Sequence, residues 1–360
     1  MVFRKGGSIS KAFKWTYKGQ ELEIVNNFNY LGIVMSSGGS FVPATNTLYG
    51  KALKAMHSLF NLTKDMNVPI NIMFNLFDAY VSSILNYNCE VWGSTKAENI
   101  ERVHRKFCKR LLNVKMSTNS LSLYAEVGRF PLHIYRYVRM VKYFLKLHTV
   151  KQGNCILKQV VFLPRLEIER KNNANNWSSK IRDILNQTGF TDVWLFPESV
   201  NNDHFIPLFK NRLRDQYITN WDVSVTSCSS MILYKELKPV FERSSYLDIV
   251  DNKKHRNIIA KLRLSSHKLS IETGRHQNID RDQRKCILCN LNDIEDEFHF
   301  VLKCPYYNDV RNALIPKYYR IRPNMFMFIK LLNSTNKTVL RKLAMYCLTC
   351  FKIRENVIYM

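Results

Sequence analysis

The chain lacks any long run of apolar residues. No stretch approaches the roughly 18 consecutive apolar side chains of a membrane-spanning helix, and residues 1–7 lack the apolar segment of a secretory signal peptide. The sequence therefore predicts an intracellular protein, in the nucleus or the cytoplasm, with no membrane partner. Its nine cysteines are unevenly spaced, unlike a disulfide framework, so we expect reduced thiols that are buried or bind metal.

Acidic residues are scarce as well. The 360 residues include 29 Asp and Glu against 54 Lys and Arg, which gives a formal net charge of +25. An excess of this size favours polyanionic partners, so RNA or DNA is the expected partner. Because 46% of the residues are apolar and 12% aromatic, the chain can still bury hydrophobic cores and is not a disordered basic tail.

The motifs of catalysis are also missing. There is no Asp-Asp dipeptide of the kind that holds metal ions in a polymerase, no G-x-x-x-x-G-K-[ST] phosphate loop and no G-x-S-x-G nucleophile elbow. The acidic clusters at residues 280–282 and 295–297 are typical of solvated charge. No catalytic residue is predicted, and the chain is not expected to be an enzyme on its own.

Helical periodicity dominates after a short β-rich start. Residues 12–17 and 21–25 alternate apolar and polar side chains around a turn, and residues 28–34 have the composition of a third strand. A loop rich in Ser and Gly, residues 36–40, precedes a series of amphipathic helices. The sequence therefore predicts a mainly α fold with a short N-terminal β-hairpin.

One predicted helix, residues 99–114, separates apolar from cationic side chains. Ile100, Val103 and Phe107 fall on one face. The opposite face and the next predicted helix carry the candidate nucleic-acid-binding residues, Arg102, Arg105, Lys106, Lys109, Arg110, Arg136, Arg139 and Lys142. A cationic face is often only solvated charge; the interpretation favoured here is that these side chains contact phosphates.

Four metal-ligand residues lie close together near the end of the chain: Cys286, Cys289, His299 and Cys304. Their spacing is C-x2-C-x9-H-x4-C. Zinc prefers four tetrahedral sulfur or imidazole ligands, and a two-residue gap lets both thiolates of a turn reach one ion. Because four protein ligands leave no position for a catalytic water, the array predicts a structural Zn²⁺. A second pair, Cys347 and Cys350, has no further ligand nearby and is expected to pack in a core.

Ordered segments along nearly the whole chain carry a likeness to one family. They are residues 1–7, like a late palm strand; Tyr30, Leu31 and Gly32, like a primer grip; residues 91–93 and 100–112, like a helical thumb; residues 124–132; residues 209–217, 263–267 and 271–275, like a connector; and the array from Cys286 to Cys304, like a CCHC zinc knuckle. Together they resemble the C-terminal part of the reverse transcriptase polyprotein of LINE-type (non-LTR) retrotransposons.

The resemblance implies five segments: palm-end strands with the primer-grip-like residues (1–35), a thumb-like basic domain (36–150), a helical connector (151–270), the zinc knuckle (271–320) and a helical tail (321–360). In this family the catalytic Asp-Asp hairpin precedes the palm strand. The fingers and most of the palm are therefore expected to lie outside this chain, although the family parent is an RNA-directed DNA polymerase. The implied partners are RNA or DNA and a longer reverse transcriptase that supplies the missing palm.

Two other interpretations stay open. The chain could be a zinc-stabilised helical interaction scaffold without a nucleic-acid function. It could also be a degenerate copy, because hairpins separated from their sheet are marginally stable. Under the favoured interpretation, the knuckle's aromatic residues divide between base stacking and a small core: Phe298, Phe300, Tyr306 and Tyr307.

Overall fold

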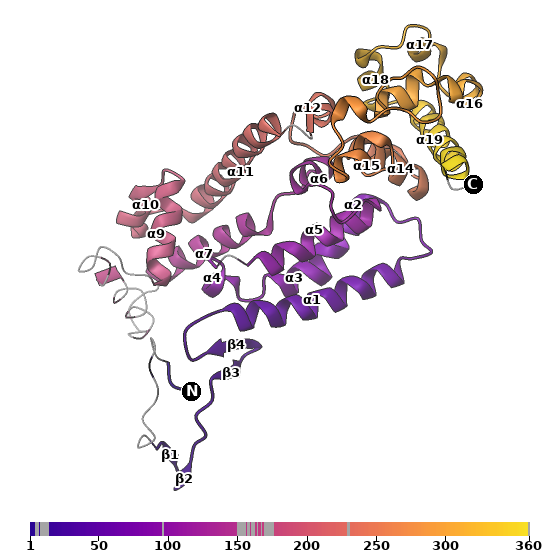
Figure 1. Ribbon diagram of the computed structural model, residues 1–360. Coiled ribbons are helices and arrows are strands. Elements are labelled where there is room, and N and C mark those ends of the chain that lie inside the picture. Colours follow the sequence, from indigo (N-terminus) through magenta and orange to yellow (C-terminus); the bar gives the residue numbers. More distant parts are fainter. Residues whose placement is uncertain are drawn as a thin grey trace. The chain divides into compact units, whose positions relative to one another are not determined.

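The structure of the chain, a computed structural model, is mainly helical, which confirms the predicted fold class (Figure 1). It describes residues 1–3, 7, 14–95, 97–149, 176–228 and 231–358, with single positions between 156 and 168. The predicted strand at residues 12–17 begins outside this range. No helix among the described residues has both the length and the apolar character needed to cross a bilayer.

The chain forms two compact units. Unit 1 comprises Met1–Asn61, Leu76–His104 and Pro131–Tyr217, and unit 2 comprises Leu62–Asn75, Arg105–Phe130 and Ile218–Met360. The unit boundaries fall within α5 (Glu98–Leu112) and α11 (Asn202–Ser227), so each of these helices contributes to both units. The units do not coincide with the segments implied by the resemblance, because the chain passes repeatedly from one unit to the other.

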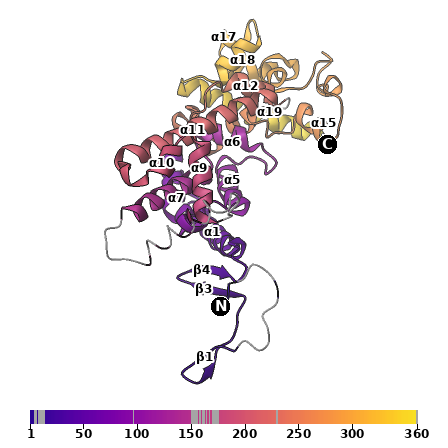
Figure 2. The same cartoon turned by 90° about the vertical axis from the view of Figure 1, so that its left-hand side faces the viewer.

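Unit 1 begins with two antiparallel hairpins: β1 (Thr16–Tyr17) with β2 (Gln20–Glu21), and β3 (Asn27–Tyr30) with β4 (Ile33–Ser36). The two residues at each tip, including Leu31 and Gly32, have positive φ, as a type I′ turn requires. The single strand predicted over residues 28–34 is therefore wrong, since the chain reverses at Gly32. In Figure 2 the β1–β2 hairpin lies away from the helices of unit 1, and its residues are exposed.

The helical part of unit 1 follows the hairpins, and Figure 1 shows β3 and β4 beside α1. Besides part of α5 and of α11, its elements are α1 (Val42–Leu62), a π-helix (Phe77–Ser82), α3 (Ser83–Leu85), α4 (Cys89–Trp92), α7 (Leu132–His148), α9 (Trp177–Gln187), α10 (Thr191–Leu195) and a 3-10 turn (Pro197–Ser199). α4 and α9 both pack on α7. α1 buries Leu48, Ala52 and Leu59 on one face, while Leu62 at its end is exposed.

α7 begins at Leu132 because a carboxylate from another helix caps it. The residue before it, Pro131, supplies no side-chain cap for the free backbone N–H groups. Glu101 of α5 accepts hydrogen bonds from the backbone N–H of Leu132 at 3.0 Å and of His133 at 2.8 Å, and a negative charge is favoured at this end of a helix. Arg136, only 2% exposed, donates to the same carboxylate at 3.1 Å. The buried charge is therefore paired.

Unit 2 is built around its last helix, α19 (Lys337–Ile358), on which α14, α16 and α18 pack. Its other helices are α2 (Ile70–Leu76), α6 (Ser120–Val127), α12 (Ile232–Leu237), α13 (Tyr246–Ile249), α14 (Lys253–Arg263), α15 (Ser270–His276), α16 (Asn308–Leu314), α17 (Lys317–Arg320) and α18 (Met325–Leu332). Between α15 and α16 lie short turns: 3-10 turns at Arg281–Gln283 and Pro305–Tyr307, and a π-helical turn at His299–Lys303. These short turns carry the metal-ligand residues.

Gly128, which ends α6, lies at a closely packed position of unit 2. Its φ is +63°, and an added Cβ would lie 2.7 Å from the backbone nitrogen of Arg243. We expect Gly128→Ala to lower the free energy of unfolding by about 1–3 kcal/mol, because both the conformation and the contact oppose a side chain. Gly50 inside α1 meets no atom within 4 Å, so Gly50→Ala should raise stability by up to about 1 kcal/mol. Urea unfolding of both variants checks the pair, and a neutral Gly128→Ala would contradict the packing.

Candidate metal centre

The four predicted ligands come from a loop and the π-helical turn that follows it. Lys285 and Ile294 form an isolated antiparallel bridge, and the backbone N–H of Cys286 donates to the Asp293 carbonyl at 2.9 Å. This pairing returns the chain toward Cys286. The backbone N–H of Cys304 then donates to the carbonyl of His299 at 2.7 Å. The π-helical turn therefore places the last two ligands next to each other.

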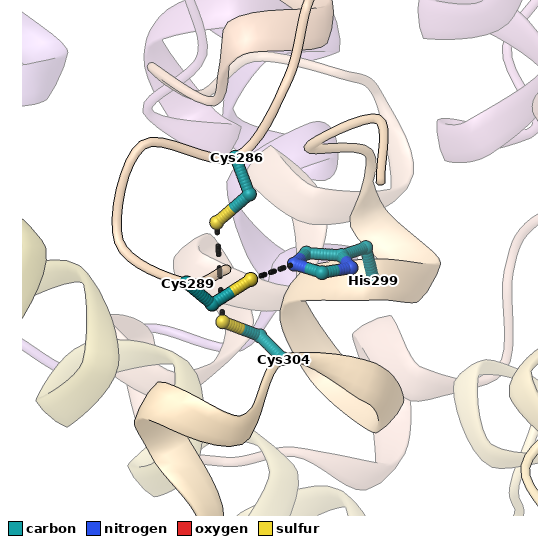
Figure 3. Close-up of side chains that lie close together, drawn as sticks. All are labelled: Cys286, Cys289, His299 and Cys304. Atoms are coloured by element: carbon teal, nitrogen blue, oxygen red, sulfur yellow. Dashed lines mark hydrogen bonds between the residues drawn. The ribbon is translucent and has the colours of Figure 1, made fainter. Parts of the chain in front are cut away.

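The four side chains point toward a common centre (Figure 3). All four lie within 4.8 Å of one another. The sulfurs of Cys286 and Cys304 are 3.9 Å apart, and the Cys289 sulfur is 3.5 Å from His299 Nε2. A tetrahedral zinc site with ordinary bond lengths has edges of roughly 3.8 Å between sulfurs and roughly 3.6 Å between sulfur and nitrogen. The predicted grouping of four ligands is confirmed, and these two distances are close to the edges of a tetrahedral site.

The cluster is sheltered from solvent on most sides. Cys286, His299 and Cys304 are buried, and Cys289 is half-buried. None of the three cysteines forms a disulfide. Among the described residues, this is the group of His, Cys, Asp and Glu side chains that has the geometry to hold a metal ion.

The three neighbouring thiols influence one another's pKa values, and all three can ionise together only if a cation binds between them. A hydrogen bond from Cys304 lowers the pKa of Cys286, and the same contact raises the pKa of Cys304. Burial raises the pKa of Cys289. Three thiolates this close repel one another, so a cation between them is what allows all three to ionise.

Backbone N–H groups reinforce the thiolate form. Each sulfur receives a backbone N–H from the residue two positions later, and each of these contacts acts to lower the thiol's pKa: Leu288 for Cys286, Leu291 for Cys289 and Tyr306 for Cys304. The same relation holds at every cysteine of the cluster. The local backbone therefore favours the thiolate form at each of the three cysteines.

An acidic residue positions the histidine ligand. The backbone N–H of His299 donates to the Asp296 carboxylate at 2.8 Å. His299 Nδ1, the ring nitrogen that faces away from the cysteines, lies 3.7 Å from the carboxylate of Asp293, which also accepts from Lys303 at 3.1 Å. At 3.7 Å this is an electrostatic contact and not a hydrogen bond, so it is the Asp296 hydrogen bond to the backbone that positions His299. The acidic cluster at residues 295–297 is therefore not simply solvated charge, as the sequence had suggested.

The loop is also fastened to the rest of unit 2. Arg311 of α16 donates to the carbonyl of Val301 at 2.9 Å and to that of Cys304 at 2.5 Å. Arg354 of α19 forms two buried hydrogen bonds to Glu295, at 2.7 Å and 2.6 Å. A metal bound at the cluster would consequently hold the packing of α16 and α19 as well as the loop.

The knuckle's aromatic residues divide between core and surface. Phe300 and Tyr307 are fully buried, with their rings 5.2 Å apart, and Phe300 also stacks on Phe351 of α19 at 4.5 Å. Phe298 is half-buried. Tyr306 is exposed, so it has the most accessible ring of the four for a partner.

The predicted nucleic-acid-binding cations occupy three environments. Arg102, Arg110, Arg139 and Lys142 are exposed, Arg105 and Lys106 half-buried, and Lys109 and Arg136 buried. The last two correct the prediction of a single cationic surface. The chain folds back over the end of α5, so Lys109 Nζ donates to the Met116 carbonyl at 2.6 Å and burial lowers its pKa. Arg136 is the partner of Glu101 described above.

The primer-grip-like residues form the tip of the β3–β4 hairpin. Tyr30 and Leu31 are exposed, and an added Cβ on Gly32 would lie 3.3 Å from the Tyr87 ring. The Tyr87 hydroxyl donates to the Leu31 carbonyl at 2.9 Å, which fixes the tip within unit 1. A role at a primer end stays a prediction.

Two features of unit 2 were missed from the sequence: α19 anchors the metal loop, and a long stretch near the end of the chain has no acidic residue. Cys347 and Cys350 are buried as predicted, but the helix that holds them also anchors the metal loop. More informative is the distribution of acids: residues 310–354 contain no Asp or Glu and ten Lys or Arg. This stretch is more one-sided in charge than the region around α5, and a count of acids along the sequence would have found it.

Comparison of the chain with protein-family models, with curated proteins and with solved structures finds no match.

Proposed function

We propose that the chain binds nucleic acid, as expected of the C-terminal, non-polymerising part of a LINE-type reverse transcriptase, and that its metal centre holds a structural Zn²⁺. The zinc assignment rests on the donor set, because three thiolates and one imidazole in a tetrahedral arrangement select zinc over harder cations such as Mg²⁺ or Ca²⁺. Four protein ligands complete the coordination sphere. The ion would therefore stabilise the fold and leave binding to other side chains.

The observation that carries the nucleic-acid proposal is the one-sided charge of α7. α7 contains no acidic residue and exposes Lys142 and Lys146, whereas its exposed Arg139 is paired with Glu90 of α4. In the part of α5 that belongs to unit 1, Glu98 and Arg102 are exposed and Glu101 is buried, so the excess of exposed positive charge comes mainly from α7. Surfaces of this kind attract a phosphate backbone and position it without reading its sequence. The ordered resemblance to a reverse transcriptase supports the same interpretation from the sequence.

A pair of lysine variants in unit 1 tests the proposal. We expect the Lys142→Ala/Lys146→Ala variant to bind a mixed-sequence oligonucleotide about tenfold or more weakly at low salt. The slope of log Kd against log salt should fall by roughly 1.5, because each lost phosphate contact removes about 0.7–0.9. Fluorescence anisotropy between low and physiological salt measures both quantities.

The matched control is Lys51→Ala/Lys54→Ala, which removes the same charge from exposed positions of α1. A general effect of net charge would weaken both variants equally, and that result would remove α7 from the binding surface. Absence of binding to every RNA and DNA tested would instead favour the helical-scaffold interpretation.

A further inference from the structure

α17 and α18 expose two aromatic rings with a lysine between them, here named the aromatic–lysine cluster: Tyr318, Phe326 and Lys330. Phe326 is 68% exposed and Tyr318 is 55% exposed. Lys330 Nζ lies 5.0 Å from the centroid of the Tyr318 ring and 6.0 Å from that of Phe326. It also donates a hydrogen bond to the Tyr318 hydroxyl at 2.8 Å. Cation–π attraction and this hydrogen bond hold the three side chains as one group.

The cluster stands on a supported helix. The opposite face of α18 buries Phe328 and Leu331. The Phe328 ring packs edge to face on Phe298, beside the metal loop, with centroids 5.9 Å apart. Asn324 caps the helix by accepting a hydrogen bond from the backbone N–H of Met327 at 2.9 Å. Because α18 already has a buried face, the exposure of Phe326 is not explained by a missing core.

The charges around the cluster are cationic. Lys317, at the start of α17, and Arg322, between the two helices, are both exposed. They belong to the stretch of residues 310–354 that contains no Asp or Glu. Met325 shares a hollow with acidic residues such as Glu236, but Phe326 and Lys330 do not line it. A ligand suited to this surface is an anion that also presents flat apolar faces.

We propose that the aromatic–lysine cluster binds single-stranded nucleic acid, with bases stacked on Tyr318 and Phe326 and a phosphate beside Lys330. The inference rests on the proposed nucleic-acid function and adds to it a site for unpaired bases. Every base offers a π face, so aromatic rings interleaved with cations bind single strands with little regard to sequence. A duplex keeps these faces stacked inside and binds the cluster less well.

A membrane surface is the other polyanion that such side chains could meet. A helix that lies in a lipid interface needs a broad apolar face directed outward. α18 has eight residues, and its Phe328, Leu331 and Leu332 are directed inward. The exposed rings are separated by a lysine that bonds to one of them, which suits separate stacked bases better than a continuous hydrocarbon layer.

The test compares single-stranded and duplex ligands on the full chain. We expect Tyr318→Ala/Phe326→Ala to weaken binding of an oligouridine by about 5- to 150-fold for each stacked base. Binding of a blunt duplex and of an abasic oligonucleotide of equal length should change less than twofold. Tyr318→Phe/Phe326→Trp should retain binding, and Tyr80→Ala, which removes an equally exposed ring from unit 1, should have no effect. Photocrosslinking of 5-bromouridine, read by mass spectrometry, should mark Tyr318 or Phe326.

The possible failures are distinguishable. If the wild-type chain binds no nucleic acid at any salt concentration, the proposed function falls and this inference falls with it. If the wild type binds but the alanine variant binds oligouridine equally well, the cluster is not the site and the proposed function stands. If the variant instead loses binding to phosphatidylserine vesicles alone, the surface belongs to a membrane and the inference is overturned. Equal thermal midpoints of all variants exclude misfolding as the cause.

Discussion

Removal of the metal is expected to unfold the segment from residue 284 to residue 307 and to loosen α19. The reason is that this segment contains only short turns, so the four metal ligands are needed to hold its parts together. Apparent binding energies of structural zinc in small domains are about 10–16 kcal/mol and act as folding energy. In this chain the loop also contributes Phe300 and Glu295 to the packing of α19. Its loss should therefore extend beyond the ligands.

The measurement combines metal analysis with hydrogen exchange. We expect one zinc per chain by mass spectrometry, and loss of amide protection across residues 284–307 and in α19 when a chelator is added. Cys289→Ser should give the same pattern, while Cys228→Ser, outside the cluster, should not. Much of the salt-sensitive nucleic-acid binding should persist in Cys289→Ser, because the cations of α7 belong to the other unit. Unchanged protection after complete removal of the metal would show that the cluster has no structural role.

The sequence predicted the fold class and the four ligands because both are local. Helical periodicity is visible within a few turns, and the spacing of Cys286, Cys289, His299 and Cys304 needs only a loop and one turn to bring them together. The predictions failed where distant segments decide the outcome. Arg136 was assigned to a cationic surface because its partner, Glu101, is 35 positions away. Lys109 was misplaced because the chain folds back over α5 only after the helix ends.

The segments that carried the family resemblance are joined in the structure by buried polar contacts. Glu126, from residues 124–132, is paired with Arg263, from residues 263–267, at 2.6 Å. His267, from the same connector-like segment, lies 2.8 Å from Glu297, beside the metal loop. Their contacts give these residues a structural role, because they join α6, α14 and the metal loop within unit 2. Pairings over 137 and 30 positions leave no periodic trace in the sequence.

The Glu126–Arg263 pair gives the second large expected effect. Arg263 also donates to the Leu332 carbonyl at 3.1 Å and to Asn333 Oδ1 at 2.8 Å, and both charged groups are fully buried. Arg263→Met should lower the free energy of unfolding by about 3–5 kcal/mol at pH 7, because Glu126 would remain as a buried charge without its main partner. Chemical denaturation measures the loss. A matched exposed change, Arg341→Met on α19, should cost less than about 0.5 kcal/mol.

The pH dependence of the same variant identifies the mechanism. In the native protein burial acts to raise the pKa of Glu126, but Arg263, with Lys238, holds it below its usual value. The pair therefore contributes stability above the unfolded-state pKa of glutamate, and this contribution is lost as the pH falls through the lowered folded-state value. In Arg263→Met the effect of burial is no longer opposed by Arg263, so the pKa of Glu126 should rise above its usual value. The loss in free energy of unfolding caused by the substitution should then shrink as the pH falls from 7 toward 5, because Glu126 takes up a proton.

The control is the double variant Glu126→Gln/Arg263→Met, which has no carboxylate at position 126. It should lose less free energy of unfolding than Arg263→Met, and its loss should not depend on pH over this range. A deficit of Arg263→Met that stays constant with pH would mean that lost packing, and not the unpaired carboxylate, causes the instability.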